Sequence, residues 1–230
     1  DEEPEVLDRA GAVELDGVSF GVGEGSVHAL LGENGAGKST LLKVLSGVYA
    51  PDGGKVLLDG RPRTFHSTIE AIRAGVAVIY QELHLVPDMS VAENLLLGHM
   101  PSRFGLVDRK RMRELALREL AELGEDIDPS VNVGTLPIAQ RQMVEIAKAL
   151  IRDATIIAFD EPTSSLTDRE VKRLFSVIRE LRKKGRVIIY VTHRLREVFE
   201  VCDSATVFRD GRVVETCNDM SCVNQDTLVR

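Results

Sequence analysis

A glycine-rich turn near the start of the chain has the spacing of a phosphate-binding loop. The segment G-E-N-G-A-G-K-S at residues 32–39 fits the pattern G-x-x-x-x-G-K-[ST]. The apolar run at 27–31 predicts a buried strand, and T-L-L-K-V-L after the turn has helical spacing. A turn between a strand and a helix presents backbone N–H groups at the positive end of the helix, where an anion binds. The alternative is an ordinary glycine-rich turn with an exposed lysine.

Each residue type in this turn has a separate expected role. Without side chains at the glycines, the backbone N–H groups can approach phosphate oxygens closely. Lys38 is expected to neutralise the β and γ phosphates of a nucleotide, and the Ser39 hydroxyl is expected to bind Mg²⁺. The predicted nucleotide-binding residues are Gly32, Asn34, Gly35, Ala36, Gly37, Lys38, Ser39 and Thr40.

Two acidic residues follow a second apolar run. Asp160 and Glu161 come directly after T-I-I-A-F at 155–159. Ligands of parallel sheets lie at the carboxyl ends of the strands, so both carboxylates are placed to act on a nucleotide. We expect Asp160 to hold Mg²⁺ through water and Glu161 to polarise the water that attacks the γ phosphate. The alternative is a solvated acidic pair at the start of a loop.

Two further polar residues end apolar runs in the same way. Gln81 follows V-A-V-I-Y, and His193 follows V-I-I-Y-V-T. A neutral imidazole at this edge could donate to the γ phosphate, and the Gln81 side chain could contact the metal or the attacking water. The alternative for each is a loop residue whose side chain is hydrogen-bonded locally. Their common position at strand ends predicts that both belong to the same site.

The elements that position these residues predict an α/β fold. Uniformly apolar runs joined by helices are typical of a mostly parallel sheet that is covered on both faces. The final V-F-R-D-G-R-V-V-E predicts a hairpin around Asp210 and Gly211. Strands are expected at residues 13–20, 27–31, 55–58, 76–80, 155–159 and 187–191. Capping boxes that begin helices are expected at Ser67 with Glu70, Ser90 with Glu93, and Thr167 with Glu170.

A mostly helical stretch interrupts this alternation. Apolar residues recur at helical spacing between 108 and 124, and another helix is expected from about 137 to 152. We therefore expect one domain over 1–230, with a core at about 5–87 and 153–230 and a helical subdomain at about 88–152.

Composition argues against several classes of protein. The chain has 230 residues, 43% of them apolar, and a net charge of −7, which disfavours a nonspecific nucleic-acid binder. No run approaches the roughly 18 apolar residues of a membrane span, and the acidic opening D-E-E-P-E is unlike a secretory signal. Three cysteines, Cys202, Cys217 and Cys222, have neither metal-site nor disulfide spacing and favour reduced thiols in the cytosol.

Taken together, these motifs resemble the nucleotide-binding domains of ABC transporters. The phosphate loop, Gln81, L-P-I-A-Q-R-Q at 136–142, F-D-E-P-T at 159–163, S-S-L-T at 164–167 and T-H-R at 192–194 follow that family's order and spacing over nearly the whole chain. More narrowly, the chain resembles the first ATPase half of the double ATP-binding proteins of bacterial monosaccharide importers. The resemblance implies a P-loop NTPase with an N-terminal antiparallel β subdomain and an inserted helical subdomain.

The same resemblance implies cofactors and partners. ATP and Mg²⁺ would lie between two homologous ATPase halves, the second of which is expected beyond this chain. Membrane-spanning permease subunits would be direct partners and an extracytoplasmic sugar-binding protein an indirect one, with no nucleic acid, at the cytoplasmic face of the bacterial membrane. The signature segment would serve the nucleotide of the partner half, through Leu136, Pro137, Ile138, Ala139 and Gln140.

The chain departs from the family pattern at three positions. Pro137 replaces the serine of L-S-G-G-Q and supplies neither a hydroxyl nor an N–H. Arg9 stands where the family usually stacks an aromatic residue on adenine, and a solvated arginine is the alternative interpretation. Thr167 replaces a common aspartate and agrees with the sugar-importer subgroup.

We therefore expect an ATPase that energises the import of a monosaccharide, as the subgroup resemblance implies. Two other functions stay open. A nucleotide-responsive regulatory module would bind ATP without hydrolysing it, which Pro137 favours and the presence of Asp160, Glu161 and His193 disfavours. An ABC-type ATPase acting on DNA or ribosomes would carry coiled coils, zinc modules or basic arms, and the sequence shows none of these.

Overall fold

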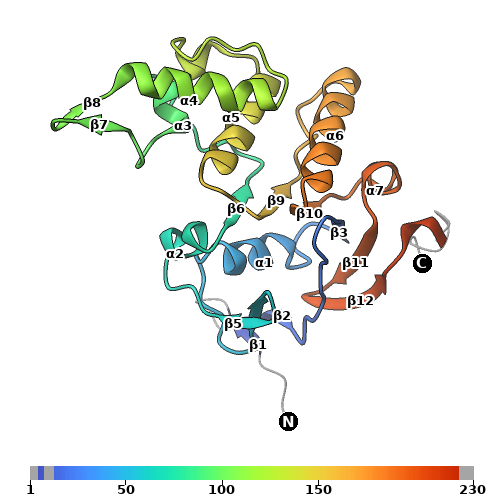
Figure 1. Ribbon diagram of the computed structural model, residues 1–230. Coiled ribbons are helices and arrows are strands. Elements are labelled where there is room, and N and C mark those ends of the chain that lie inside the picture. The colour runs from blue at the N-terminus through green and yellow to red at the C-terminus, as the bar shows by residue number, and fades with distance from the viewer. Residues whose placement is uncertain (1–4, 8–12, 223–230) are drawn as a thin grey trace.

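The computed structural model describes residues 5–7 and 13–222, and its centre is a six-stranded sheet (Figure 1). The strand order is β12-β11-β3-β10-β9-β6. All neighbouring strands are parallel except β12, which pairs antiparallel with β11 at one edge. The strands are β3 (Val27–Gly32), β6 (Val76–Ile79), β9 (Ile156–Asp160), β10 (Val187–Val191), β11 (Ser204–Arg209) and β12 (Arg212–Cys217). The predicted α/β fold with a mostly parallel sheet is confirmed.

Short antiparallel pairs surround this sheet. β1 (Glu5–Leu7) pairs with β2 (Val13–Asp16), β4 (Val56–Leu58) with β5 (Arg61–Arg63), and β7 (Ser102–Arg103) with β8 (Leu106–Val107). The first two pairs lie below the sheet in Figure 1, on the side of the N-terminus. The third projects from the helical part of the chain.

Helices cover both faces of the sheet. They are α1 (Lys38–Leu45), α2 (Thr68–Arg73), α3 (Val91–Leu95), α4 (Arg109–Glu122), α5 (Ile138–Ile151), α6 (Asp168–Lys183) and α7 (Leu195–Val201), with one-turn 3₁₀ helices η1 (Val133–Thr135) and η2 (Met220–Cys222). Because side chains alternate along a strand, neighbouring residues of β9 bury into different clusters. Ile157 and Phe159 pack with α3 to α7, whereas Ala158 packs with Leu42 of α1.

Local sequence explains where most helices begin. The capping boxes of Ser90 with Glu93 and Thr167 with Glu170 form as predicted, each with reciprocal hydrogen bonds. At Ser67 only half of the box forms. The Ser67 hydroxyl accepts the Glu70 N–H. The Glu70 carboxylate, however, accepts the N–H of His66 at 2.9 Å instead of the N–H of Ser67. The reciprocal half of this predicted box is wrong, because the Glu70 carboxylate binds the N–H of the preceding residue.

Two predicted boundaries also move. The strand expected over 13–20 ends at Asp16, because Gly17 has a left-handed φ of 57° and turns the chain. Phe20 then leaves the strand and stacks on the His28 ring, with centroids 5.3 Å apart. The helix expected from 137 begins at Ile138, since Pro137 has an extended ψ of 153° and lies outside it as the N-cap.

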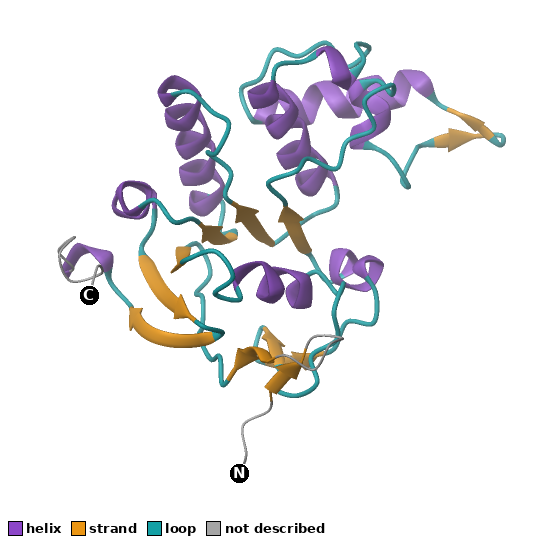
Figure 2. Ribbon diagram, turned by 180° about the vertical axis from the view of Figure 1, so that it is seen from behind, coloured by secondary structure: helices purple, strands orange, loops and turns teal. Residues whose placement is uncertain are grey.

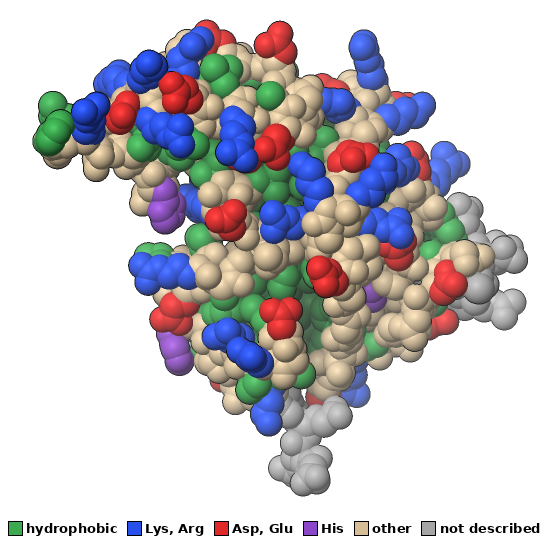
Figure 3. Space-filling model, viewed as in Figure 1, with side chains coloured by type: hydrophobic (Ala, Val, Ile, Leu, Met, Phe, Trp, Pro, Cys, Tyr) green, Lys and Arg blue, Asp and Glu red, His purple; other side chains and the backbone are tan. Residues whose placement is uncertain are grey.

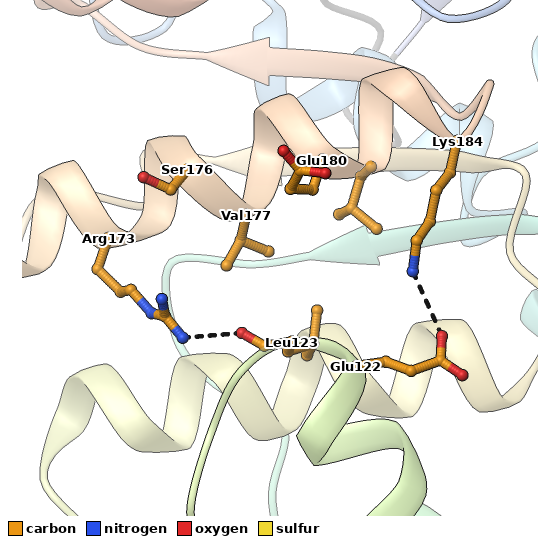
Figure 4. A pocket seen from close by; sticks show the side chains of 8 residues that line it. Glu122, Leu123, Arg173, Ser176, Val177, Glu180 and Lys184 are labelled. Carbon is orange, nitrogen blue, oxygen red and sulfur yellow. Dashed lines mark hydrogen bonds and ion pairs between the residues drawn. The ribbon is translucent and has the colours of Figure 1, made fainter.

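The helical part of the chain packs over one face of the sheet, as Figures 1 and 2 both show. α3, α4 and α5 pack against one another and share the larger hydrophobic cluster with α6. α6 also contacts the end of α4 through polar groups around a small pocket (Figure 4). Arg173 donates to the Leu123 carbonyl at 2.9 Å, and Lys184 pairs with Glu122 at 3.3 Å.

Candidate functional site

The carboxyl ends of four parallel strands place the predicted site residues at one edge of the sheet. In register, Ala29 of β3, Tyr190 of β10, Phe159 of β9 and Ile79 of β6 lie side by side. The residues that follow these positions along each strand therefore emerge together. They are the phosphate loop, His193, the Asp160 and Glu161 pair, and Gln81.

The phosphate loop depends on glycine at three positions. Gly32, Gly35 and Gly37 have φ of 152°, 82° and 98°, which L-residues with side chains rarely adopt. At Gly32 a Cβ would also clash with the carbonyl oxygen of Phe208, so any side chain would displace β11. Around Gly35, by contrast, no atom of the described residues other than its chain neighbours lies within 4 Å of the position of a Cβ. The turn therefore leaves space at Gly35 for a phosphate to approach the backbone.

Lys38 lies across this loop. It begins α1 directly after Gly37, and its ammonium donates to the carbonyl oxygens of Gly32 at 2.7 Å and Glu33 at 2.8 Å. Burial lowers the pKa of Lys38, while the charges of Glu161 and Asp160 oppose that shift. A partly desolvated cation at a helix N-terminus attracts an anion strongly, so the loop fits the phosphates of a nucleotide.

The turn of the β11–β12 hairpin supports the loop from behind. Gly211 donates its N–H to the Ala36 carbonyl at 3.3 Å, and its own carbonyl accepts the N–H of Asp16 at 2.8 Å. Arg212 forms an ion pair with Asp16 beside these bonds. The sequence predicted this hairpin but not its contact with the phosphate loop, because no local pattern links residues 36 and 211.

Asp160 is the last residue of β9, and the burial and charges around its carboxylate favour a bound cation. Burial raises the pKa of this carboxyl, the adjacent charge of Glu161 raises it further, and Lys38 and Lys43 act in the opposite direction. Two neighbouring carboxylates repel each other, and a divalent cation would relieve that repulsion. The exposed Ser39 hydroxyl adds a second hard oxygen donor.

This donor set fits Mg²⁺ better than a metal held by the protein alone. Over residues 5–7 and 13–222, no group of three or more His, Cys, Asp or Glu side chains could hold a metal ion. Mg²⁺ usually binds one or two protein oxygens, keeps several waters and takes its other ligands from phosphates. Asp160 and Ser39 match that pattern.

Glu161 has an unusual backbone conformation. Its φ of 45° lies in the left-handed region, which costs a residue with a side chain on the order of 1 kcal/mol. The conformation is held by the Glu161 N–H, which donates to the Val191 carbonyl at 3.0 Å. It directs the carboxylate toward His193, whose Nδ1 lies 3.1 Å from Oε1 of Glu161. Two residues that are 32 positions apart in the sequence thus form one acid–base pair.

A buried carboxylate that the sequence analysis missed holds this pair in place. Glu197 accepts hydrogen bonds from three hydroxyl groups, those of Thr163 at 2.6 Å, Tyr190 at 2.8 Å and Thr192 at 3.1 Å. Thr163 belongs to the loop after Glu161, and Thr192 directly precedes His193. The burial of Tyr190 and the charge of Glu197 raise the pKa of the tyrosine hydroxyl, which stays a donor. The sequence signal that could have indicated this carboxylate is a hydroxyl residue beside each motif, Thr163 after Glu161 and Thr192 before His193.

Gln81 and the segment of residues 136–140 come from other elements. Gln81 is exposed, two residues after β6 ends. The segment of residues 136–140 forms the start of α5, which packs on the opposite face of the sheet from α1. A buried side chain nevertheless connects α5 with the acidic loop, since Gln142 donates to the Pro162 carbonyl at 2.9 Å. Arg9, the expected adenine-stacking residue, lies outside the described residues.

Comparisons with known proteins agree with this fold. A family model described as "ABC transporter" matches residues 15–164. The chain is 58% identical over 215 residues to the arabinose import ATP-binding protein AraG of Azospirillum brasilense, and 56% identical over 219 residues to that of Pseudomonas fluorescens (strain Pf0-1). These matches cover 94% and 95% of this chain but only 41% and 43% of the relatives. The chain thus spans about two fifths of their length.

Solved structures show the same fold. An ATP-binding cassette of an ABC transporter in its ADP conformation superposes with a TM-score of 0.85 at 27% identity, covering 99% of this chain and 95% of the other. A nucleotide-free cassette from an ABC transporter gives 0.83 at 28% identity, with 93% and 88% covered. Within the described residues, no helix is both long and apolar enough to span a membrane.

Proposed function

Because this chain belongs to the ABC transporter family, we propose that it binds and hydrolyses ATP to energise the import of a monosaccharide. The observation that carries the proposal is the edge of the sheet described above. There the phosphate loop with Lys38 meets Asp160, Glu161 and His193, which come from three neighbouring parallel strands. An anion site, an acidic metal site and a base held by hydrogen bonds are the three requirements of phosphoryl transfer to water.

We assign a role to each group at this edge. Lys38 and the loop N–H groups bind the β and γ phosphates, with Gly32, Asn34, Gly35, Ala36, Gly37, Ser39 and Thr40 forming the cradle. Ser39 and Asp160 hold Mg²⁺, with Gln81 as a further contact to the metal or to water. Bound Mg²⁺ would neutralise charge on the phosphate oxygens.

The proton chemistry is assigned to Glu161 and His193. Glu161 polarises the attacking water, because its carboxylate is held in a fixed orientation and general bases must lie within hydrogen-bonding reach of the proton they accept. His193 orients that carboxylate by donating from Nδ1, and donation from Nε2 to the γ phosphate at the same time requires the imidazolium form. Glu197 positions both residues and contacts neither reactant.

Partners follow from the same assignment. Residues 136–140 are proposed to contact the nucleotide of a homologous second ATPase half, whose presence is consistent with relatives more than twice as long as this chain. Membrane-spanning permease subunits would bind the assembled halves at the cytoplasmic face of the membrane, and a sugar-binding protein would act on the other side. The sugar itself is inferred from the arabinose import relatives, since no residue described here is proposed to contact it.

The decisive experiment separates binding from turnover. Calorimetry with ATP and Mg²⁺ should show binding to the 230-residue chain, and Glu161→Gln should bind equally well. In the assembled transporter, Glu161→Gln should lower phosphate release about 10²- to 10⁴-fold, the usual contribution of a general base. Glu82→Gln, an exposed carboxylate after the neighbouring strand β6, is the matched control and should keep the parental rate. Absence of ATP binding would contradict the proposal, and a parental rate for Glu161→Gln would contradict only the choice of base.

One alternative has a specific observation in its favour. Pro137 leaves the signature segment without a hydroxyl, which favours an ATP-responsive regulatory domain with weak hydrolysis. The Glu161–His193 contact argues against it, because a domain without turnover has no need of a base in a strained conformation. Phosphate release by the assembled protein distinguishes the two functions. Duplex binding with a steep salt dependence would instead support the non-transport ATPase.

A further inference from the structure

The hairpin of β7 and β8 carries apolar side chains into solvent at a position that the ATPase site does not use. Phe104 is 92% exposed, Leu106 76% and Val107 47%. The hairpin projects away from the rest of the molecule in both ribbon views (Figures 1 and 2). In the space-filling view its tip is one of the most isolated groups of hydrophobic side chains on that face (Figure 3).

The backbone keeps this apolar tip exposed. Phe104 and Gly105 have φ of 53° and 80°, as a tight two-residue hairpin turn requires. Ser102 pairs with Val107 and Arg103 with Leu106, so the two strands are in register and the turn is held between them. The Arg103 guanidinium lies 5.4 Å from the centre of the Phe104 ring and leaves that ring exposed. The tip is therefore a defined hairpin turn with its apolar side chains exposed.

A basic collar lies directly behind the tip. Exposed Arg103, Arg109, Lys110, Arg111 and Arg113 flank it, and Asp108 is the one acidic residue between positions 102 and 113. The chain as a whole carries a net charge of −7, so this segment is opposite in sign to the chain as a whole. Arg111 pairs with Glu114 at 3.4 Å, but both side chains are more than half exposed and the pair is weak.

We propose that the β7–β8 hairpin inserts its apolar tip into the surface of an anionic lipid bilayer. A narrow apolar tip with cations set behind it matches the order of a membrane interface, where acyl chains lie beneath anionic headgroups. Charge complementarity to the basic collar, together with the need to bury the apolar tip, distinguishes the possible binding partners. An acidic protein surface would satisfy the collar but would need a pocket for Phe104, and a nucleic acid would leave Leu106 and Val107 exposed. This inference is independent of the proposed ATPase activity.

The absence of tryptophan from the chain allows a direct test. Phe104→Trp places a single fluorophore at the tip, and Leu57→Trp places one on β4 at a residue that is 58% exposed. On adding phosphatidylcholine vesicles that contain phosphatidylglycerol, the emission of the Phe104→Trp variant should shift to the blue and be quenched by brominated acyl chains. The emission of the Leu57→Trp variant should stay unchanged. No shift in the Phe104→Trp variant would overturn the proposal.

Sedimentation with the same vesicles tests each part of the surface. Phe104→Ser with Leu106→Ser should lower the partition coefficient by at least about tenfold, as loss of two inserted apolar side chains requires. Leu57→Ser with Val214→Ser removes two similarly exposed apolar residues and should have no effect. Lys110→Gln with Arg113→Gln should weaken binding to anionic vesicles about tenfold, whereas Arg169→Gln with Lys172→Gln on α6 should not.

Three outcomes would overturn lipid insertion. The first is an unchanged partition coefficient in the tip variant. The second is binding that depends on the collar but not on the tip, which indicates charge attraction alone. The third is a tip that affects binding to RNA or to membrane protein subunits while vesicles do not bind. Circular dichroism and ATP affinity should be unchanged in every variant, because none of these residues is buried or belongs to the nucleotide site.

Discussion

The N-termini of α1 and α5 share one difference from those of α4 and α6. The surroundings of these two termini, however, are not alike. α4 and α6 begin after Asp108 and Thr167, whose side chains accept a backbone N–H. Within the described part of the chain, α1 and α5 have neither a side-chain cap nor an acidic residue in the first turn. Caps and acidic residues would compete with an anion for the same N–H groups and the same positive end.

The difference between the two lies in what surrounds them. α1 begins inside a concave loop made by three left-handed glycines, with the Lys38 ammonium held over it. α5 begins on the surface, with Pro137 as its cap and the Ile138 side chain 40% exposed. The Arg141 side chain near it donates to the carbonyls of Leu136 and Gly134 and is therefore not directed outward. We therefore expect the first terminus to bind phosphate alone and the second to complete a site that another surface provides.

The largest expected difference between the two regions concerns stability at acid pH. His28 of β3 is buried between Ser204 and Thr206, and desolvation lowers its pKa from 6.5 to about 4. The unfolded chain therefore takes up a proton that the folded chain does not, and stability falls as pH drops from 6.5 through 4. The loss is up to about 3 kcal/mol for this shift. Hydrogen exchange should show β3 and the phosphate loop opening before α5 does.

Urea unfolding measures the contribution of His28 to stability when it is done at about pH 7 and at about pH 4.5, because these two values span most of the pH range over which His28 acts. His28→Gln should remove much of the difference between the two pH values, whereas His66→Gln, at an exposed position, should leave it as in the parent. An identical pH dependence in His28→Gln and the parent would contradict the assignment to His28.

Removal of the lysine tests whether α1 binds phosphate through charge. Lys38→Ala should weaken ATP binding by about 1.5–3 kcal/mol, the usual value of hydrogen bonds to charged groups, which is roughly 10- to 100-fold. Lys43→Ala removes the same charge from the last turn of the same helix and should change the affinity little. Equal losses of ATP affinity in both variants, measured by calorimetry, would show that Lys38 acts only through its long-range charge.

The open space at Gly35 gives a finer comparison. Gly35→Ala and Gly60→Ala each place a methyl group at a left-handed position with no described atom within 4 Å, so each should cost about 1 kcal/mol of stability. Only Gly35→Ala should also lower ATP affinity, by about tenfold or more, because its methyl group enters the proposed cradle. Thermal unfolding and nucleotide titration of both variants distinguish a steric effect on the ligand from strain in the chain.

The smallest effect is expected at α5. Pro137→Ser restores a hydroxyl and an N–H at the start of this helix and should raise phosphate release by the assembled protein about tenfold at most, the value of one added hydrogen bond. ATP affinity of the 230-residue chain alone should not change, since α1 and α5 lie on opposite faces of the sheet. A changed affinity in the isolated chain would show that α5 contacts the same nucleotide as Lys38.

Much of the local structure was predictable because its causes lie within a few residues. The strand at 187–191, the helix between Asp108 and Gly124 and the capping boxes at Ser90 and Thr167 all formed as expected. The β7–β8 hairpin was not predicted. Its strands are two residues long, too short for any alternation to be recognised.

The phosphate-loop spacing, the fold class and the position of Asp160, Glu161, Gln81 and His193 after apolar runs could all be predicted from the residues alone. These features follow from backbone conformation and hydrophobic periodicity, which act between near neighbours. The strand order β12-β11-β3-β10-β9-β6, and with it the contact of His193 with Glu161, could be seen only in the folded chain. The same is true of the Glu197 hydrogen bonds and the link from Gln142 to the acidic loop. The reason is that lateral strand order depends on burying both faces of the sheet at once, and residues from the whole chain contribute to those two cores.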